Sequence, residues 1–192
     1  MGVRIVDFEV VENAIPGLLS ITPKQVTDER GTIRELFRRS AFDSVGVRLT
    51  EFRQINVTES AYGVVRGMHA ENLTKLLTVA AGTAFGAYID LRRDSSSFGA
   101  VETIELRPGV QVLVPAGVAN GFQALTDGCQ YVYCFDAEWE PGMAGQACNP
   151  LDPDIGIAWP IEVDVGDPAQ ISAKDRDAPS FADIASKLER DE

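Results

Sequence analysis

The sequence predicts an all-β protein, a sandwich or barrel built from short antiparallel strands. Two observations favour this class. Valine and isoleucine alternate with polar residues over short runs, and clusters of glycine, proline and aspartate separate these runs about every 8–12 residues. The expected strands cover residues 18–27, 32–37, 49–58, 75–79, 84–91, 101–106, 110–114, 118–125 and 129–135.

Three turns organise these strands. Asp28-Glu29-Arg30-Gly31 is expected to join the first two strands. Ala80-Ala81-Gly82-Thr83 has the composition of a hairpin turn between residues 75–79 and 84–91, and Asp127-Gly128 leads into the last strand.

Two segments predict helices, a short one at Ser40–Ser44 and a longer one at Ser180–Arg190. Pro179 and Ser180 form a start signal, with Asp183 at capping-box spacing. One apolar stripe should pack the second helix on the outside of the barrel, and it consists of Phe181, Ile184 and Leu188.

The chain of 192 residues fits one domain. We expect a barrel over about residues 15–140, followed by an irregular arm and the C-terminal helix over about residues 141–192. The arm is expected because the segment between Pro141 and Pro179 is rich in proline, aspartate and glycine.

Composition excludes several partners. A net charge of −12 disfavours binding to nucleic acids and to anionic membrane surfaces, because both kinds of binding require a basic face on the protein. The N-terminus does not resemble a signal peptide, and no apolar run approaches the roughly 18 residues of a membrane span. The three cysteines show no CxxC spacing, so we expect free thiols and a cytoplasmic protein.

The single histidine, His69, is the most informative residue. One imidazole excludes a multi-histidine metal cage. No sequence motif indicates a cofactor, and we expect none. One imidazole is sufficient for a general base, because the pKa of histidine lies near neutrality.

Several motifs occur in an order that resembles the dTDP-4-dehydrorhamnose 3,5-epimerases, over about residues 15–182. They are Asp28-x-Arg30-Gly31, Arg53-Gln54-x-Asn56, residues 63–69 (GVVRGMH), Lys75, residues 90–99 (DLRRDSSSFG), residues 115–122 (PAGVANGF), Leu151-Asp152-Pro153, Ala158-Trp159-Pro160 and residues 172–177 (SAKDRD). The resemblance implies a metal-free jelly roll of the cupin type, a homodimer, and a nucleotide-diphosphate sugar as substrate, with dTDP as the expected nucleotide.

The family reaction removes a proton beside the ketone of a 4-keto-6-deoxy hexose and returns it to the opposite face. This needs a base, an enolate stabiliser, an acid and cationic anchors. By resemblance, His69 is the base, Asp177 is the carboxylate that orients it, and Lys75 stabilises the enolate. The resemblance also implies a set of substrate-binding residues, namely Arg30, Glu35, Gln54, Asn56, Arg66, Asn120 and Trp139.

Two positions depart from the family pattern. Asn120 stands where the family has a second histidine, and Trp139, two residues before Pro141, stands where the family has its catalytic tyrosine. An indole N–H donates a hydrogen bond but does not act as an acid. Glu138 and Tyr133 are the candidates for a replacement.

Three hypotheses follow. The first is an epimerase with an altered reaction, such as epimerisation at one carbon or isomerisation of the keto sugar. The second, motivated by Asn120 and Trp139, is a non-catalytic cupin that binds a nucleotide sugar or serves as a scaffold. A metal-dependent cupin dioxygenase ranks third, because one histidine does not form its usual site.

Overall fold

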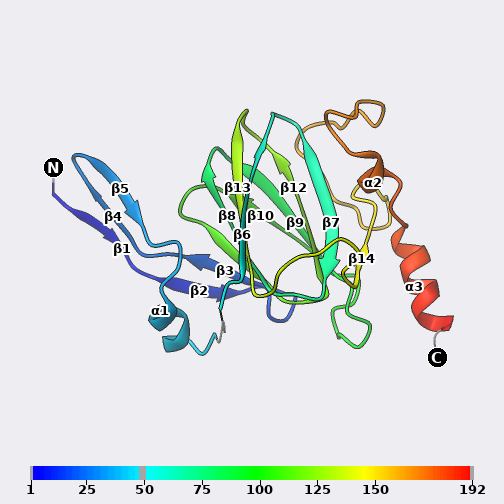
Figure 1. Cartoon of the computed structure of the whole chain (residues 1–192), viewed down its shortest axis with the longest axis horizontal. Coiled ribbons are helices and arrows are strands. Elements are labelled where there is room, and N and C mark those ends of the chain that lie inside the picture. The colour runs from blue at the N-terminus through cyan, green and yellow to red at the C-terminus, as the bar shows by residue number, and fades with distance from the viewer. Residues whose placement is uncertain (1, 48–50, 191–192) are drawn as a thin grey trace.

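Two large antiparallel sheets face each other in the computed structural model, which describes residues 2–47 and 51–190 and, for residues 188–190, the backbone alone (Figure 1). The six-stranded sheet has the order β2 (Glu9–Glu12), β3 (Leu19–Thr22), β11 (Gln111–Val114), β8 (Lys75–Ala81), β13 (Cys129–Phe135), β6 (Gln54–Ser60). The five-stranded sheet has the order β10 (Val101–Leu106), β9 (Ala84–Asp90), β12 (Val118–Ala124), β7 (Val65–Glu71), β14 (Gly145–Ala147).

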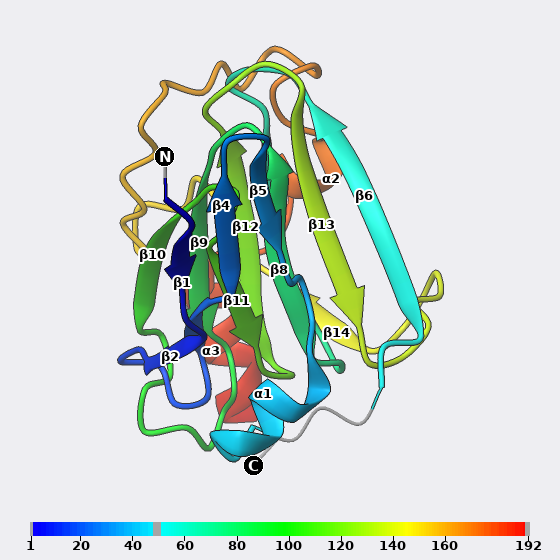
Figure 2. The same ribbon diagram turned by 90° about the vertical axis from the view of Figure 1, so that its left-hand side faces the viewer.

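A third, three-stranded sheet projects away from this sandwich (Figures 1 and 2). It contains β1 (Arg4–Val6), β4 (Gln25–Asp28) and β5 (Gly31–Arg34). The turn expected at residues 28–31 joins β4 to β5, where Asp28 pairs with Gly31. Gly31 has a φ of 130°, which a residue with a Cβ rarely adopts.

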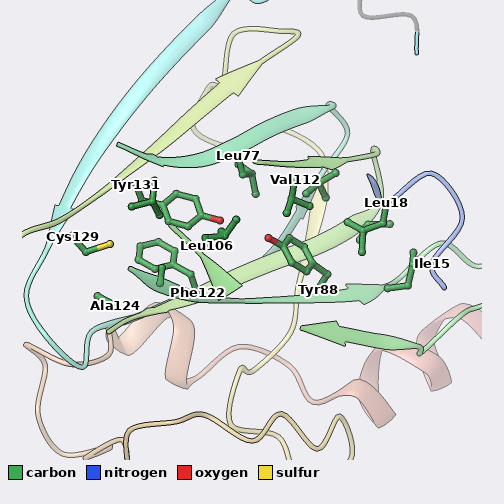
Figure 3. Close-up of a cluster of buried hydrophobic side chains, with 14 residues drawn as sticks. Ile15, Leu18, Leu77, Tyr88, Leu106, Val112, Phe122, Ala124, Cys129 and Tyr131 are labelled. Carbon is green, nitrogen blue, oxygen red and sulfur yellow. The ribbon is translucent and has the colours of Figure 1, made fainter. Parts of the chain in front are cut away.

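The main core fills the space between the two large sheets (Figure 3). Leu77 and Tyr131 come from the six-stranded sheet, and Tyr88 and Phe122 from the five-stranded sheet. The rings of Phe122 and Tyr131 stack with centroids 4.1 Å apart. Burial of these inward-facing side chains from both sheets holds the sandwich together.

Two connections differ from the sequence-based expectation. Residues 80–83 do not close a hairpin, because β8 and β9 belong to different large sheets. The strand expected over residues 18–27 is two strands, β3 and β4, which lie in different sheets and are separated by Pro23 and Lys24. Turn composition specifies a reversal of the chain but not the strand that becomes the neighbour. Of the strand expected over residues 49–58, positions 49 and 50 lie outside the described residues.

Three helices lie outside the sheets among the described residues: α1 (Arg39–Ser44), α2 (Ala173–Arg176) and α3 (Phe181–Arg190). The capping box predicted at the start of α3 is present, since Asp183 N donates to Ser180 Oγ at 3.1 Å and Ser180 N donates to Asp183 Oδ2 at 3.2 Å. Phe181 and Ile184 pack on a second apolar cluster that includes Met68 of β7 and Ile89 of β9. The side chain of Leu188, the third residue of the predicted stripe, lies outside the described residues. No helix in the described part of the chain is long and apolar enough to cross a membrane.

Candidate active site

A cavity of about 730 Å³ opens beside β7, within the range typical of small-molecule sites. Its lining comes from β6, β7, β13 and β14, from the loop before β14, and from the arm at residues 168–175. Residues 168–175 therefore form one wall of the cavity, and the other walls come from the four strands and from the loop before β14. Among the described residues, no group of three His, Cys, Asp or Glu side chains is placed to hold a metal ion.

A bulge in β7 explains why both Arg66 and His69 line this cavity. Residues three apart on a regular strand face opposite sides. In β7, however, His69 pairs with Asn120 and Arg66 pairs with Phe122, so β7 contains one residue more than β12 over this stretch. Gly67 permits the close approach of the strands, since a Cβ at this position would lie 2.5 Å from Gly121 Cα.

His69 is paired with a buried carboxylate. The Nε2 atom of His69 lies 2.7 Å from Oδ1 of Asp175, and the side chains are 31% and 8% exposed. An ionised carboxylate only accepts hydrogen bonds, so Nε2 carries the hydrogen and Nδ1 is left as the basic nitrogen. Burial opposes ionisation of Asp175, but the hydrogen bond and charge of His69 outweigh it and lower the Asp175 pKa.

The expected partner, Asp177, is not the residue that contacts His69. Its side chain is 63% exposed and pairs with Arg176, whose Nε lies 2.8 Å from Asp177 Oδ1. Asp175 and Asp177 are two residues apart at a short helix, where such residues face different directions. The resemblance identified the correct motif and the wrong aspartate within it.

A local signal for Asp175 is present in the sequence. Asp175 is three residues after Ser172, and Asp175 N donates to Ser172 Oγ at 3.1 Å. This is the N-cap arrangement of α2, a helix that was not predicted. The cap fixes the backbone of the residue whose carboxylate meets His69.

Lys75 is held by three acceptors. Its Nζ donates to His69 O at 3.0 Å, to Asn120 Oδ1 at 2.5 Å and to the carboxylate of Glu71. The side chain is 4% exposed, and burial lowers the Lys75 pKa while Glu71 opposes that change. Burial also opposes ionisation of Glu71, but the charge and the hydrogen bond of Lys75 outweigh burial and lower the Glu71 pKa. Glu71 was not among the predicted site residues.

Tyr133 places a phenol in the cavity. It lines the cavity together with His69 and Glu71, whereas Glu138, the other candidate acid, is exposed and is not part of the lining. Burial is the main cause that raises the Tyr133 pKa, so the phenol keeps its proton at neutral pH.

The remaining polar candidates fall into two groups. Asn56, Arg66 and Trp139 line the cavity. Gln54 is not among the lining residues, and its Oε1 accepts a hydrogen bond from Trp139 N at 2.7 Å. Gln54 therefore positions the loop and is not part of the cavity surface.

Arg30 and Glu35 are not brought to the cavity of their own chain. Arg30 lies in the turn between β4 and β5 of the projecting sheet (Figure 1). Its side chain is 87% exposed and pairs with Asp28. Glu35 follows β5 and pairs with Arg38. Neither residue lines the cavity beside His69.

The fold and the cavity define a jelly-roll protein with a His–Asp pair, and comparison with known proteins identifies its family. The family model described as dTDP-4-dehydrorhamnose 3,5-epimerase matches residues 12–183. The chain is 34% identical over 179 residues to dTDP-4-dehydrorhamnose 3,5-epimerase from Methanothermobacter thermautotrophicus, covering 88% of this chain and 92% of the relative. It is 32% identical over 176 residues to the enzyme of that name from Mycobacterium tuberculosis, covering 88% and 86%.

Solved structures similar to this chain belong to sugar epimerases as well. NovW, a 4-keto-6-deoxy sugar epimerase of Streptomyces spheroides, superposes with a TM-score of 0.86 at 28% identity, covering 96% of this chain and 92% of that chain. ChmJ, a 3'-monoepimerase of Streptomyces bikiniensis solved with dTDP-quinovose, gives 0.83 at 30% identity, covering 92% and 89%. This chain belongs to the dTDP-4-dehydrorhamnose 3,5-epimerase family, which confirms the cupin-type fold and the isomerase class expected from the motifs.

Proposed function

We propose that this protein epimerises a dTDP-linked 4-keto-6-deoxy hexose by moving a proton on and off a carbon next to the ketone. The observation that carries this proposal is the pairing of His69 with the buried Asp175 in a cavity that also contains the phenol of Tyr133. A base and an acid in one cavity are what such a proton exchange requires.

His69 is the proposed base. Its Nδ1 accepts the proton from carbon, and Asp175 stabilises the imidazolium that results. Asp175 is suited to this role because its lowered pKa keeps it ionised near neutral pH.

Tyr133 is the proposed acid. A phenol with a raised pKa keeps its proton until a carbanion-like centre develops beside it. A variant of ChmJ in which a histidine is replaced by asparagine and a tyrosine by phenylalanine has been solved with dTDP, and this chain retains one residue of each kind in its cavity. On this proposal Trp139 takes no part in proton transfer, and its aromatic ring forms part of the cavity wall.

The cations of the cavity are suited to the diphosphate. Arg66 and Lys174 both line it, and they provide local positive charge in a chain whose net charge is −12. Trp139 offers an aromatic face for a base or a sugar ring. Because the arm supplies Asp175 and Lys174, the proposal treats residues 1–192 as one functional unit. A cytoplasmic location is part of the proposal, since Cys129, Cys134 and Cys148 are free thiols.

The test is deuterium exchange in D2O with a dTDP-4-keto-6-deoxy hexose. We expect the wild-type protein to place deuterium next to the ketone, and the carbon that acquires it distinguishes one-carbon from two-carbon epimerisation. His69→Asn should slow exchange about 10²- to 10⁴-fold, the usual contribution of a general base. Tyr133→Phe should reduce formation of the epimer more than exchange into the starting sugar, because His69 alone performs the first step.

The competing hypothesis is a non-catalytic protein that binds a nucleotide sugar. It predicts saturable binding of dTDP by calorimetry and no deuterium incorporation by the wild-type protein. That combination of results would exclude the epimerase.

We also propose that the protein is a homodimer in which the projecting sheet reaches the partner's cavity. Arg30 and Glu35 are then substrate-binding residues that act in the second copy. Two observations support this proposal. The β4–β5 turn and β7, which lines the cavity, lie on opposite sides of the molecule (Figure 1), and the projecting sheet carries the exposed apolar side chains of Ile5 and Ile33.

Complementation tests the dimer. Arg30→Ala and His69→Asn should each impair activity, but co-expression of the two variants should produce mixed dimers with one intact site. Random pairing predicts recovery to about a quarter of wild-type activity. Activity no higher than that of either variant alone would exclude a shared site.

A further inference from the structure

We propose that Glu71 is a positioning residue that keeps Lys75 charged and fixed in the wall of a smaller cavity, which shares His69, Glu71 and Tyr133 with the main cavity. This inference deepens the proposed function, on which it rests, and it assigns a role to a carboxylate that the resemblance did not identify.

The geometry around Lys75 leaves its ammonium group with no uncommitted hydrogen. An ammonium has three N–H donors. Three protein acceptors surround this one, His69 O, Asn120 Oδ1 and the carboxylate of Glu71. A substrate oxygen therefore receives a hydrogen bond from Lys75 only by replacing one of these acceptors.

The three acceptors are not equivalent. The backbone carbonyl of His69 is fixed by β7, and Glu71 bears a full negative charge. Asn120 offers a neutral side-chain amide on β12. A charge-assisted bond is about twice as strong as a neutral one. The incoming oxygen is therefore expected to replace Asn120 while Glu71 keeps its hold on Lys75.

The charges around Lys75 point to the same residue. The titratable or charged groups that line the smaller cavity next to Lys75 are Arg66, His69 and Glu71 of β7 and Tyr133 of β13, and β12 contributes the neutral Asn120. Glu71 is the one carboxylate of this set. Burial lowers the Lys75 pKa, and Glu71 is the group that raises it. Without Glu71, a buried ammonium beside an arginine would lose its counter-charge.

The test is a pH titration of the Lys75 amine by heteronuclear NMR in Glu71→Gln. Assignment is tractable, because the chain has four lysines, Lys24, Lys75, Lys174 and Lys187, and the Lys75→Met spectrum identifies the missing signal. We expect the Lys75 titration midpoint in Glu71→Gln to fall by about 1–3 pH units, the effect of removing an adjacent opposite charge. An unchanged midpoint would overturn the proposal.

Two further variants separate charge from structure. Glu71→Asp keeps the charge and should restore a midpoint near that of the wild type. Glu105→Gln makes the same change in charge at an exposed site on β10 and should leave Lys75 unaffected. If Glu105→Gln shifted the midpoint as far as Glu71→Gln does, the effect would be one of net charge and the proposal would fail.

Activity supplies an independent measurement. When the rate of deuterium exchange is plotted against pH, the alkaline limb of the curve should lie at lower pH in Glu71→Gln than in the wild type. It should move together with the titration midpoint of Lys75. A limb that stays in place while the midpoint moves would show that Glu71 controls Lys75 without bearing on catalysis, and would refute the positioning role. Absence of exchange by the wild-type protein would refute the proposed function, while the NMR titration would still report whether Glu71 keeps Lys75 charged.

Discussion

At the scale of single residues, this site depends on which of two neighbouring aspartates is buried. Asp175 faces His69 at 2.7 Å, and Asp177 faces solvent and Arg176. Both were visible in the sequence as part of one motif. Their directions follow from α2 and its cap, which bring one carboxylate to β7 and leave the other outside.

The two aspartates form a matched pair for mutagenesis. Asp175→Asn removes the charge that stabilises the His69 imidazolium, and we expect kcat to fall about 10²- to 10⁴-fold. Asp177→Asn should leave kcat within about twofold of wild type, because an exposed ion pair contributes little. Steady-state kinetics of both variants provides the measurement, and equal losses would contradict the assignment of Asp175.

At the scale of secondary-structure elements, the bulge of β7 and the short helix α2 together form the site. The bulge turns Arg66 and His69 toward one cavity. Helix α2 then brings a carboxylate from a segment 106 residues further along the chain. The strands from β8 to β13 had clear sequence signals, but β7 was not among the expected strands. A four-residue helix has too few positions to show a helical period.

The cap of α2 can be tested directly. Ser172→Ala removes the acceptor for Asp175 N and should cost about 1 kcal/mol of stability, the usual value for an N-cap. We also expect a drop in kcat, because Asp175 loses its anchor. Ser172→Thr retains the hydroxyl and should restore most of both quantities in thermal unfolding and activity assays. Loss of stability with unchanged kcat would show that the cap does not position Asp175.

At the scale of the whole molecule, ionised carboxylates that are held by hydrogen bonds in the folded state set the response to acid. Asp90, at the end of β9, is fully buried and accepts hydrogen bonds from Arg92 Nε at 2.8 Å and from Ser95 and Ser97 Oγ, each at 2.6 Å. Burial raises the pKa of this carboxyl, but these donors outweigh burial and lower it below its usual range. Asp90 thereby fixes the loop over residues 91–100 between β9 and β10.

The lowered pKa of Asp90 in the folded state determines the direction in which stability changes with pH. The stability from Asp90 is complete above the unfolded pKa of about 3.9 and is lost as the pH falls through the lower folded value. Chemical unfolding at neutral pH should show Asp90→Asn destabilised by about 1.5–3 kcal/mol. The gap between variant and wild type should narrow as the pH is lowered below about 4. A gap that is independent of pH would contradict this account.

The sequence by itself determined the strand positions from Lys75 to Phe135, the turn at Asp28–Gly31, the cap of α3 and the candidacy of His69. Each of these depends on local alternation, turn chemistry or residue type, which a linear pattern records. Tertiary structure alone decided that β8 and β9 join different sheets, that Asp175 and not Asp177 meets His69, and that Glu71 and Asn120 enclose Lys75. These outcomes depend on which strands become neighbours and which side chains are removed from water, and both are set by burial of the sandwich core between distant segments.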